Sequence, residues 1–352
     1  MQINATYSAA IDTAPAQAHR TRLLGLINAS WTTQVIATAV EIGLPDAMAD
    51  GPRTVAALAE TSATHAPSLY RLLRAMVSLE LCDEDHAGNF GLTPAGSLLR
   101  TAAADSLCAW AAMSGARSWL LWGRLAESVR TGESIRKRTL ADDDFTHLDD
   151  DAQAAGLFNR AMAELTVPVA ADIARVIDFS GVSRVVDVGG GYGQLLCSVL
   201  ASHPKVHGVL FDMAHAIEKV TGHFCDAGVA DRCEVVTGSF FDDVPAGADV
   251  YMLKSILHDW DDERCLTILR ACRRAMPPGA RLLIVERVAS AKAGASPYDQ
   301  FVARADLHMM VANGGCERTE DAYRNLLESC GLQLAQVTPL SNAFSALTAV
   351  RL

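Results

Sequence analysis

The chain has 352 residues, of which 50% are hydrophobic, and it carries a formal net charge of −11 at pH 7. This length is comfortable for two domains, each with a sizeable core. The negative charge disfavours a polyanionic partner, so we expect no nucleic acid to bind.

The nine cysteines are scattered along the chain, with no CxxC pair and no zinc-like spacing of Cys and His. They indicate reduced thiols in a cytoplasmic protein and no metal site. No stretch approaches the roughly 20 uninterrupted apolar residues of a membrane helix. No secretory signal pattern opens the sequence. We therefore expect a cytoplasmic protein without a membrane partner.

Residues from about 20 to 110 are predicted to form helices and one short β-hairpin. Apolar residues recur at helical spacing over 66–80, and Thr93 begins another helix after the hairpin. Helix, helix and hairpin are the order of a winged helix. Because the second helix offers only two arginines and acidic residues follow it, we expect residues 1–107 to serve structure or dimerisation rather than DNA binding.

Residues 108–178 are predicted to be helical and rich in large apolar side chains. Trp110, Trp119 and Trp122 fall within 13 positions, in a chain that is only 6% aromatic. Two interpretations remain open. These side chains can pack between the two domains, or some of them can line a flat substrate pocket.

From 179 to 352, short apolar runs alternate with helical segments. The runs are 184–188, 206–211, 233–236, 249–253, 281–285 and 332–338. Apolar strands of about five residues separated by helices are typical of a mostly parallel sheet. The fold class predicted for this part is α/β, a doubly wound Rossmann-like domain.

The strand at 184–188 leads directly into a glycine-rich turn and then a helix. Gly189 and Gly191 permit a tight turn that a ligand can approach closely. Asp212 ends the next strand, where a carboxylate can bind ribose hydroxyls. A dinucleotide and S-adenosylmethionine both fit this arrangement. The short glycine spacing, and Asp187 as a polar acceptor for a cationic amino-acid group, favour S-adenosylmethionine.

Five motifs then occur in order along the second half of the chain. They are DVGGGYG (187–193), FD (211–212), GSFF (238–241), KSILHDWDD (254–262) and GGCERT (314–319). Together they resemble the class I small-molecule O-methyltransferases. That family includes plant caffeate and flavonoid enzymes, animal acetylserotonin O-methyltransferase, and bacterial enzymes that tailor polyketides and phenazines.

The resemblance covers nearly the whole chain and implies a winged-helix dimerisation domain, hence a homodimer. It also implies a set of S-adenosylmethionine contacts. These are Asp187, Gly189, Gly191, Asp212, Gly238, Ser239, Phe240 and Lys254. Ser239 departs from the acid that the plant enzymes carry near the adenine, whereas Phe240 can still pack on the ring. Lys254 matches a lysine that reaches the adenine end.

The resemblance implies that His258 is the catalytic base and that Glu286 and Glu317 are the carboxylates beside it. A phenol with a pKa near 10 is a poor nucleophile at pH 7, and a histidine can accept its proton. A helix that began near Lys254 would place Lys254 and His258 on one face. The residues expected to contact the acceptor are Trp110, Met113, Phe158, Met162, Asp259, Met309 and Asn313.

The predicted function is transfer of a methyl group to a hydroxyl of a small aromatic molecule, in secondary metabolism such as antibiotic biosynthesis. An alternative is a relative that holds S-adenosylmethionine as a bound ligand while it hydroxylates or decarboxylates its substrate. That outcome is typical where the base is missing, and here His258 and both carboxylates are present. A winged-helix regulator that senses the cofactor is disfavoured by the charge.

Overall fold

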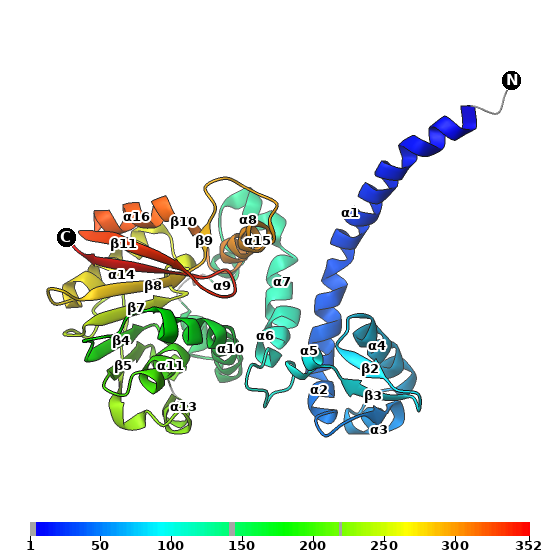
Figure 1. The fold of residues 1–352 in the computed structure, drawn as a ribbon, viewed down its shortest axis with the longest axis horizontal. Coiled ribbons are helices and arrows are strands. Elements are labelled where there is room, and N and C mark those ends of the chain that lie inside the picture. Colours follow the sequence, from blue (N-terminus) through cyan, green and yellow to red (C-terminus); the bar gives the residue numbers. More distant parts are fainter. Residues whose placement is uncertain (1–4, 141–144, 218–219) are drawn as a thin grey trace. The chain divides into compact units, whose positions relative to one another are not determined.

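The computed structural model describes residues 5–140, 145–217 and 220–352 (Figure 1). The chain divides into two compact units, Met1–Ala116 and Arg117–Leu352. Helices of the segment 108–178 occur in both units, so the division of the chain into 1–107, 108–178 and 179–352 stays a prediction.

The first unit is mainly helical and carries one small sheet with the strand order β1-β3-β2. Its strands are β1 (Arg53–Thr54), β2 (Cys82–Glu84) and β3 (Asn89–Leu92). Its helices are α1 (Ala5–Glu41), α2 (Leu44–Ala47), α3 (Val55–Thr61), α4 (Ala66–Ser78), α5 (Pro94–Ser97) and α6 (Cys108–Met113), followed by a π-helical turn at Ser114–Ser118 that runs into the second unit. The predicted hairpin is present, with Cys82 opposite Leu92. Leu58, Leu73 and Met76 are fully buried in the core beside it.

The helix α1 leaves a row of large apolar side chains exposed. Their exposed fractions are Leu23 57%, Leu24 47%, Leu26 58%, Ile27 62% and Trp31 66%. By length and composition the segment Gln17–Glu41 could also cross a membrane, a test that helices of soluble proteins pass as well. The sequence-based expectation concerned uninterrupted apolar runs only, whereas this segment is apolar on average over its length. An apolar surface of this kind is typical of a protein–protein interface.

The second unit is built on a seven-stranded sheet with the order β11-β12-β8-β7-β4-β5-β6. The parallel strands are β4 (Arg184–Val188), β5 (His207–Asp212), β6 (Cys233–Thr237), β7 (Val250–Lys254) and β8 (Arg281–Glu286). The antiparallel strands are β11 (Leu332–Pro339) and β12 (Ser345–Arg351). The predicted α/β fold class is confirmed. Only β12 was absent from the predicted runs, and it lies between β11 and β8.

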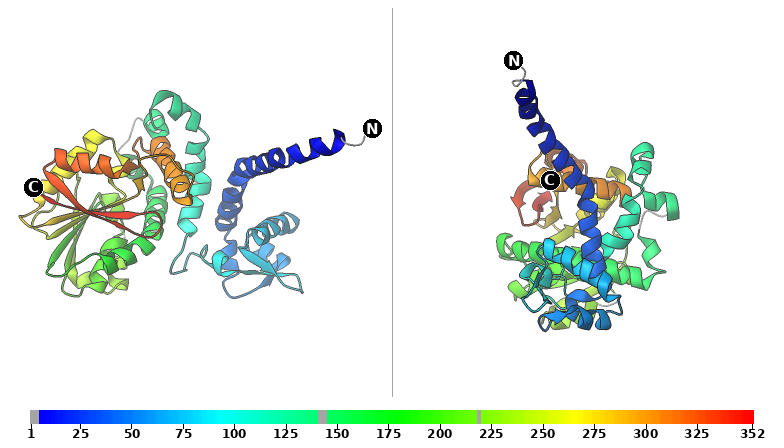
Figure 2. Two further views of the ribbon diagram at one scale, coloured as in Figure 1. Left: turned by 45° about the horizontal axis from the view of Figure 1, so that its top comes forward. Right: turned by 90° about the vertical axis from the view of Figure 1, so that its right-hand side faces the viewer.

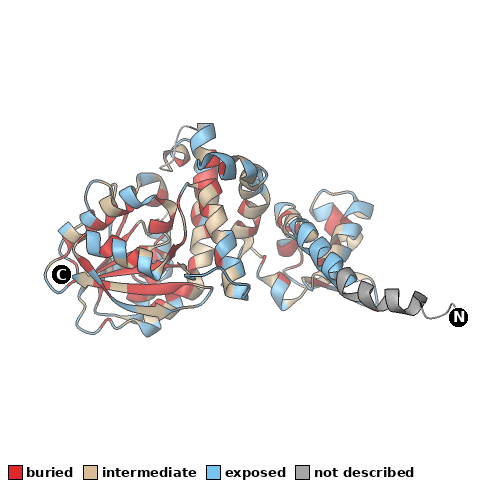
Figure 3. Ribbon diagram, turned by 90° about the horizontal axis from the view of Figure 1, so that it is seen from above, coloured by how far each residue is buried: buried red, intermediate tan, exposed pale blue. Residues whose placement is uncertain are grey.

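Helices cover both faces of this sheet (Figures 1 and 2). On one side lie α10 (Ala152–Val176), α11 (Gln194–Ser202), α12 (Ala214–Ile217) and α13 (Val220–Asp226), and on the other α14 (Asp262–Ala275) and α16 (Glu320–Ser329). Successive residues of a strand point to opposite faces. Val185 therefore joins the core under α10 and α11, and Val186 joins the core under α14 and α16. Strands inside the sheet, such as β4, β7 and β8, are mostly buried, and Figure 3 shows buried strands in the interior of this unit.

The remaining elements of this unit connect these strands and helices. They are α7 (Trp119–Trp122), α8 (Leu125–Thr131), α9 (Ile135–Leu140), α15 (Pro297–Ala312), β9 (Val288–Ala289), β10 (Arg318–Thr319) and 3-10 turns at Thr146–Leu148, Ala230–Arg232 and Leu257–Asp259. Helix α15 lies against α7, α8 and α9 (Figure 1). The short strand β10 pairs in parallel with β9, which follows β8 directly. This pairing brings the GGCERT motif to the end of β8.

Replacing Leu26 with Asp should weaken self-association, because the apolar row on α1 is then expected to bury a charge in the dimer. An unpaired buried charge costs several kcal/mol, so the dimer dissociation constant should rise by roughly tenfold or more. Light scattering across micromolar concentrations measures it. Leu352→Asp, at another exposed leucine, in the second unit, is the control. An unchanged dimer in Leu26→Asp would place the interface elsewhere.

Candidate active site

The ends of two neighbouring parallel strands build the centre of the candidate site. β8 ends at Glu286, and β7 ends at Lys254 next to it. His258 lies in the 3-10 turn Leu257–Asp259 that follows β7. The next helix, α14, begins only at Asp262, so Lys254 and His258 do not share a helical face. The conditional prediction of a helix at this position is therefore wrong.

Glu286 fixes the turn that carries His258. Its Oε1 accepts backbone N–H bonds from Ile256 at 2.9 Å, Leu257 at 2.9 Å and His258 at 3.4 Å. Glu286 is fully buried, so no water competes for these bonds. A turn whose N–H groups converge on one carboxylate oxygen has little freedom to change its conformation.

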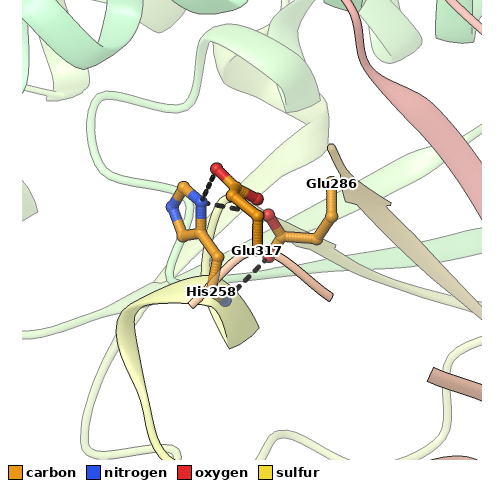
Figure 4. Close-up of side chains that lie close together, drawn as sticks. All are labelled: His258, Glu286 and Glu317. Atoms are coloured by element: carbon orange, nitrogen blue, oxygen red, sulfur yellow. Dashed lines mark hydrogen bonds and ion pairs between the residues drawn. The ribbon is translucent and has the colours of Figure 1, made fainter. Parts of the chain in front are cut away.

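The imidazole ring of His258 is held from one edge by two carboxylates (Figure 4). Its Nδ1 lies 3.2 Å from Oε1 of Glu317 and 3.5 Å from Oε2 of Glu286. All three residues are buried. Because an ionised carboxylate can only accept a hydrogen bond, the contact with Glu317 requires a proton on Nδ1, and the neutral ring presents the lone pair of Nε2. The atom that can act as a base is therefore Nε2.

The GGCERT motif positions the second carboxylate. A Cβ on Gly315 would lie 2.0 Å from the carbonyl oxygen of His258, so only glycine lets the two segments approach this closely. The backbone N–H of Glu317 donates to Oδ1 of Asp306 on α15 at 2.9 Å. Arg318 donates to the carbonyl oxygens of Leu257 and Trp260. The His258 turn is thus held from both β8 and this motif.

Several carboxylates surround the His258 ring and change its pKa. Burial by itself lowers the pKa of His258, but the carboxylates around the ring more than reverse this effect. These carboxylates are those of Glu286, Asp259 and Glu317, and they raise the pKa of His258 to about 9. Burial raises the pKa of Glu286. In the free enzyme the ring is therefore mostly protonated at pH 7.

Nδ1 of His258 and one oxygen each of Glu286 and Glu317 lie within 4.8 Å of one another, a cluster compact enough for a small cation. We interpret it as a shared proton, because Nδ1 is already within hydrogen-bonding distance of Glu317.

A second group of residues lies at the carboxyl ends of β4 and β5. Asp212 accepts the N–H of Gly191 at 2.7 Å and that of Met213 at 2.7 Å. Asp187 is buried, and burial together with the charge of Asp212 raises its pKa to about 7. Among the described residues, Oδ2 of Asp187 has no hydrogen-bond partner. An unsatisfied buried carboxylate beside an open glycine turn fits a cationic ligand group.

The other predicted cofactor residues lie around this turn. Gly189 has a φ of 70°, and a Cβ there would lie 3.4 Å from the ring of Phe240. Phe240 is therefore next to the turn. Gly238 donates its N–H to the carbonyl of Asp212 at 3.1 Å. Ser239 uses its hydroxyl inside its own loop, where it accepts the N–H of Phe241.

Lys254 lies on a different side of this group. Its strand β7 is next to β4, whereas Ser239 and Phe240 follow β6, beyond β5. Its Nζ lies 5.3 Å from the ring centroid of Phe344. Burial and the charge of Arg287 lower its pKa to about 8, while Asp187 and two other acids act against this. The predicted contact of Lys254 with the adenine stays a prediction.

Two predicted acceptor residues, Asp259 and Asn313, lie close to His258. Asn313 donates a hydrogen bond to Asp259, whose Oδ1 lies 3.8 Å from Nε2 of His258. Met309 is buried on α15, one turn before Asn313. Phe158 and Met162 lie on α10. Trp110 and Met113 belong to the first unit, on α6, so their place in an acceptor pocket stays a prediction.

Sequence reasoning missed two residues that hold the carboxylates. Nη1 of Arg287 lies 3.7 Å from Oε1 of Glu317, and its guanidinium lies 4.2 Å from the ring centroid of Phe344. Asp306 accepts the backbone N–H of Glu317. The position of Arg287, directly after the glutamate that ends β8, was a sequence signal for its role. No sequence signal connects Asp306 with Glu317.

Two family models match the chain. One, an O-methyltransferase domain, matches residues 122–333, and the other, an O-methyltransferase dimerisation domain, matches residues 24–102. The chain is 39% identical to phenazine O-methyltransferase PhzM of Lysobacter antibioticus, over 93% of this chain and 95% of that protein.

A crystal structure of the O-methyltransferase NcsB1 from neocarzinostatin biosynthesis is also similar. It contains S-adenosylmethionine and 2-hydroxy-5-methyl naphthoic acid, and it matches with a TM-score of 0.75 and 33% identity over 91% of this chain and 96% of that one. A further relative is aclacinomycin 10-hydroxylase RdmB of Streptomyces purpurascens. It is 34% identical over 86% of this chain and 82% of that protein. Its name describes a hydroxylase.

Replacing Asp212 with Ala should weaken the binding of S-adenosylmethionine. The carboxylate holds the N–H of Gly191, and it is the residue expected to bind the ribose. Loss of a charge-assisted bond costs about 1–3 kcal/mol, or roughly 5- to 150-fold in the dissociation constant measured by calorimetry. Asp226→Ala, at an exposed aspartate, should leave binding unchanged. Wild-type affinity in Asp212→Ala would contradict this site.

Proposed function

Because the chain belongs to the S-adenosylmethionine-dependent O-methyltransferase family, we propose that it methylates a hydroxyl of a small aromatic natural product with His258 as the general base. The enzyme uses S-adenosylmethionine and is a homodimer. The observation that carries the proposed mechanism is the pair of carboxylates at Nδ1 of His258, which leaves Nε2 to face the acceptor.

The chain's own residues would align the hydroxyl and remove its proton. Nε2 of His258 accepts that proton, and the ring becomes an imidazolium. Glu286 and Glu317 stabilise this cation and keep Nδ1 protonated, so the ring does not change tautomer. Alignment of the two reactants supplies a further part of the rate enhancement.

S-adenosylmethionine supplies a methyl group that is already activated as a sulfonium. Asp187, Gly191 and Asp212 would hold it, and Phe240 would pack beside it. The unpartnered oxygen of Asp187 supports this assignment, since the amino-acid end of the ligand carries an ammonium group.

The acceptor is proposed to be a flat aromatic hydroxyl compound. The phenazine O-methyltransferase and the naphthoate complex among the relatives support this class. The acceptor pocket is proposed to contain Trp110, Met113, Phe158, Met162, Asp259, Met309 and Asn313. A role in a biosynthetic pathway of secondary metabolism agrees with these relatives. A cytoplasmic location is supported by the nine free cysteines.

A second candidate function is hydroxylation or decarboxylation with S-adenosylmethionine as a bound ligand. The hydroxylase RdmB among the relatives supports keeping this alternative. The complete cluster of His258, Glu286 and Glu317 favours methyl transfer. Mass spectrometry of the product separates the two, because methylation adds one CH₂ and no other change.

Replacing His258 with Ala should lower turnover by roughly 10²–10⁴-fold, with cofactor affinity near wild type. The base is protonated below its pKa of about 9, so the single-turnover rate of the wild type should rise with pH toward that value. In His258→Ala the rate should follow ionisation of the phenol, whose pKa is near 10. The deficit of the variant should therefore shrink as the pH rises.

The same measurement includes Glu286→Gln and Glu317→Gln, which should each cost less because neither residue accepts the proton. His207→Ala, at an exposed histidine, is the control. Parallel curves of similar height for wild type and His258→Ala would show that His258 is not the base.

A further inference from the structure

Trp122 on α7 and His308 on α15 form a pair that the catalytic cluster does not use. Nε1 of Trp122 donates a hydrogen bond to Nδ1 of His308 at 3.0 Å. The two ring planes are within 9° of parallel, and the ring centroids are 6.3 Å apart. This is the geometry of two rings joined edge to edge by a hydrogen bond that lies in their plane.

This bond decides the protonation of His308. An indole nitrogen can only donate, so Nδ1 of His308 must accept, and the neutral ring then carries its hydrogen on Nε2. Burial, followed by the charges of three cations, lowers the pKa of His308 to about 4. The cations are His258, Arg136 and Arg287. At neutral pH the side chain is therefore a neutral donor in one fixed tautomer.

The charge of His258 contributes to the lowered pKa of His308, so α15 brings this donor within electrostatic reach of the catalytic cluster. Asp306 on the same helix accepts the N–H of Glu317, and Asn313 donates to Asp259. His308 directly precedes Met309, and its side chain lies on another side of α15 than Asp306 and Asn313, toward Trp122. Among the described residues, Nε2 of His308 has no hydrogen-bond partner, and His308 is only partly buried. A positioned donor without a protein partner is available to a ligand.

We propose that the Nε2–H group of His308 donates a hydrogen bond to a neutral acceptor atom on the aromatic substrate and so selects among hydroxyaromatic compounds. The acceptor atom is a ring nitrogen or a carbonyl oxygen, in addition to the hydroxyl that is methylated. A neutral donor suits a neutral acceptor, because a buried anion would need a charged partner. This inference rests on the proposed O-methyltransferase function and adds the substrate feature that the enzyme reads.

Trp122 is a positioning residue in this scheme. Its indole N–H keeps the hydrogen of His308 on Nε2 and the ring in place. Without that bond the imidazole could exchange tautomers, and Nε2 would then present a lone pair to the substrate. The selectivity should depend on the indole nitrogen and not only on the bulk of the aromatic ring.

The test uses pairs of acceptors that have the same shape. Hydroxyquinoline is compared with naphthol, and hydroxyphenazine with hydroxyanthracene, so that one CH is replaced by a ring nitrogen in the first pair and two in the second. We expect the wild type to favour the nitrogen-containing member by roughly 10- to 100-fold in kcat/KM, since a substrate without the acceptor atom leaves the donor unpaired. Equal values within the pairs would overturn the proposal.

The variants identify the residue that is responsible. His308→Leu should abolish the preference by lowering kcat/KM for the nitrogen-containing members alone. His308→Gln, which keeps a donor, should retain part of the preference, and Trp122→Phe should reduce it. An equal loss for both members of a pair would indicate a purely structural role and would overturn the proposal. His207→Leu is the matched control, and melting temperature with cofactor affinity confirms that each variant is folded.

Failure of the proposed function has a different result. If the wild type transferred no methyl group to any of these compounds, or changed them in another way, both the O-methyltransferase assignment for such acceptors and the role of His308 would fall. If it methylated both members of each pair equally, only the role of His308 would fall.

Discussion

The interaction on which the site depends is the buried carboxylate of Glu286 at the end of β8. One carboxylate oxygen accepts hydrogen bonds from backbone N–H groups of the turn after β7. The other lies near Nδ1 of His258, which belongs to that turn. The same side chain therefore sets both the backbone conformation and the ring orientation. A buried carboxylate is costly unless it is satisfied in this way, so the turn and the acid stabilise each other.

The charge around this carboxylate is balanced across several elements. Glu317 also contacts Nδ1 of His258, and Arg287 approaches the same oxygen of Glu317. These interactions are strong because the groups are shielded from water, and for the same reason each depends on its partner. The raised pKa of His258 results from this excess of acids over bases. The positive charge of the bound cofactor would offset part of that excess.

The turn also connects the two halves of the reaction. Its Asp259 bonds to Asn313 on α15, where the acceptor is proposed to bind. The Trp260 ring, directly after the turn, has Phe240 near it on the cofactor side, with ring centroids 6.1 Å apart. A single segment would thus border both proposed ligand sites, which is what alignment of a donor and an acceptor requires.

The sequence by itself determined the parallel strands β4 to β8, the glycine turn and the motifs that contain His258, Glu286 and Glu317, because these features are local patterns of apolar runs, glycines and acids. It did not determine the partners of those residues. The 3-10 turn at His258 exists because Glu286, 28 residues away, bonds its backbone. The bonds from Glu317 to Asp306 and from Trp122 to His308 likewise join separate elements, the latter across 186 residues. Such contacts arise only when the sheet edge and α15 come together, so the tertiary structure decided them.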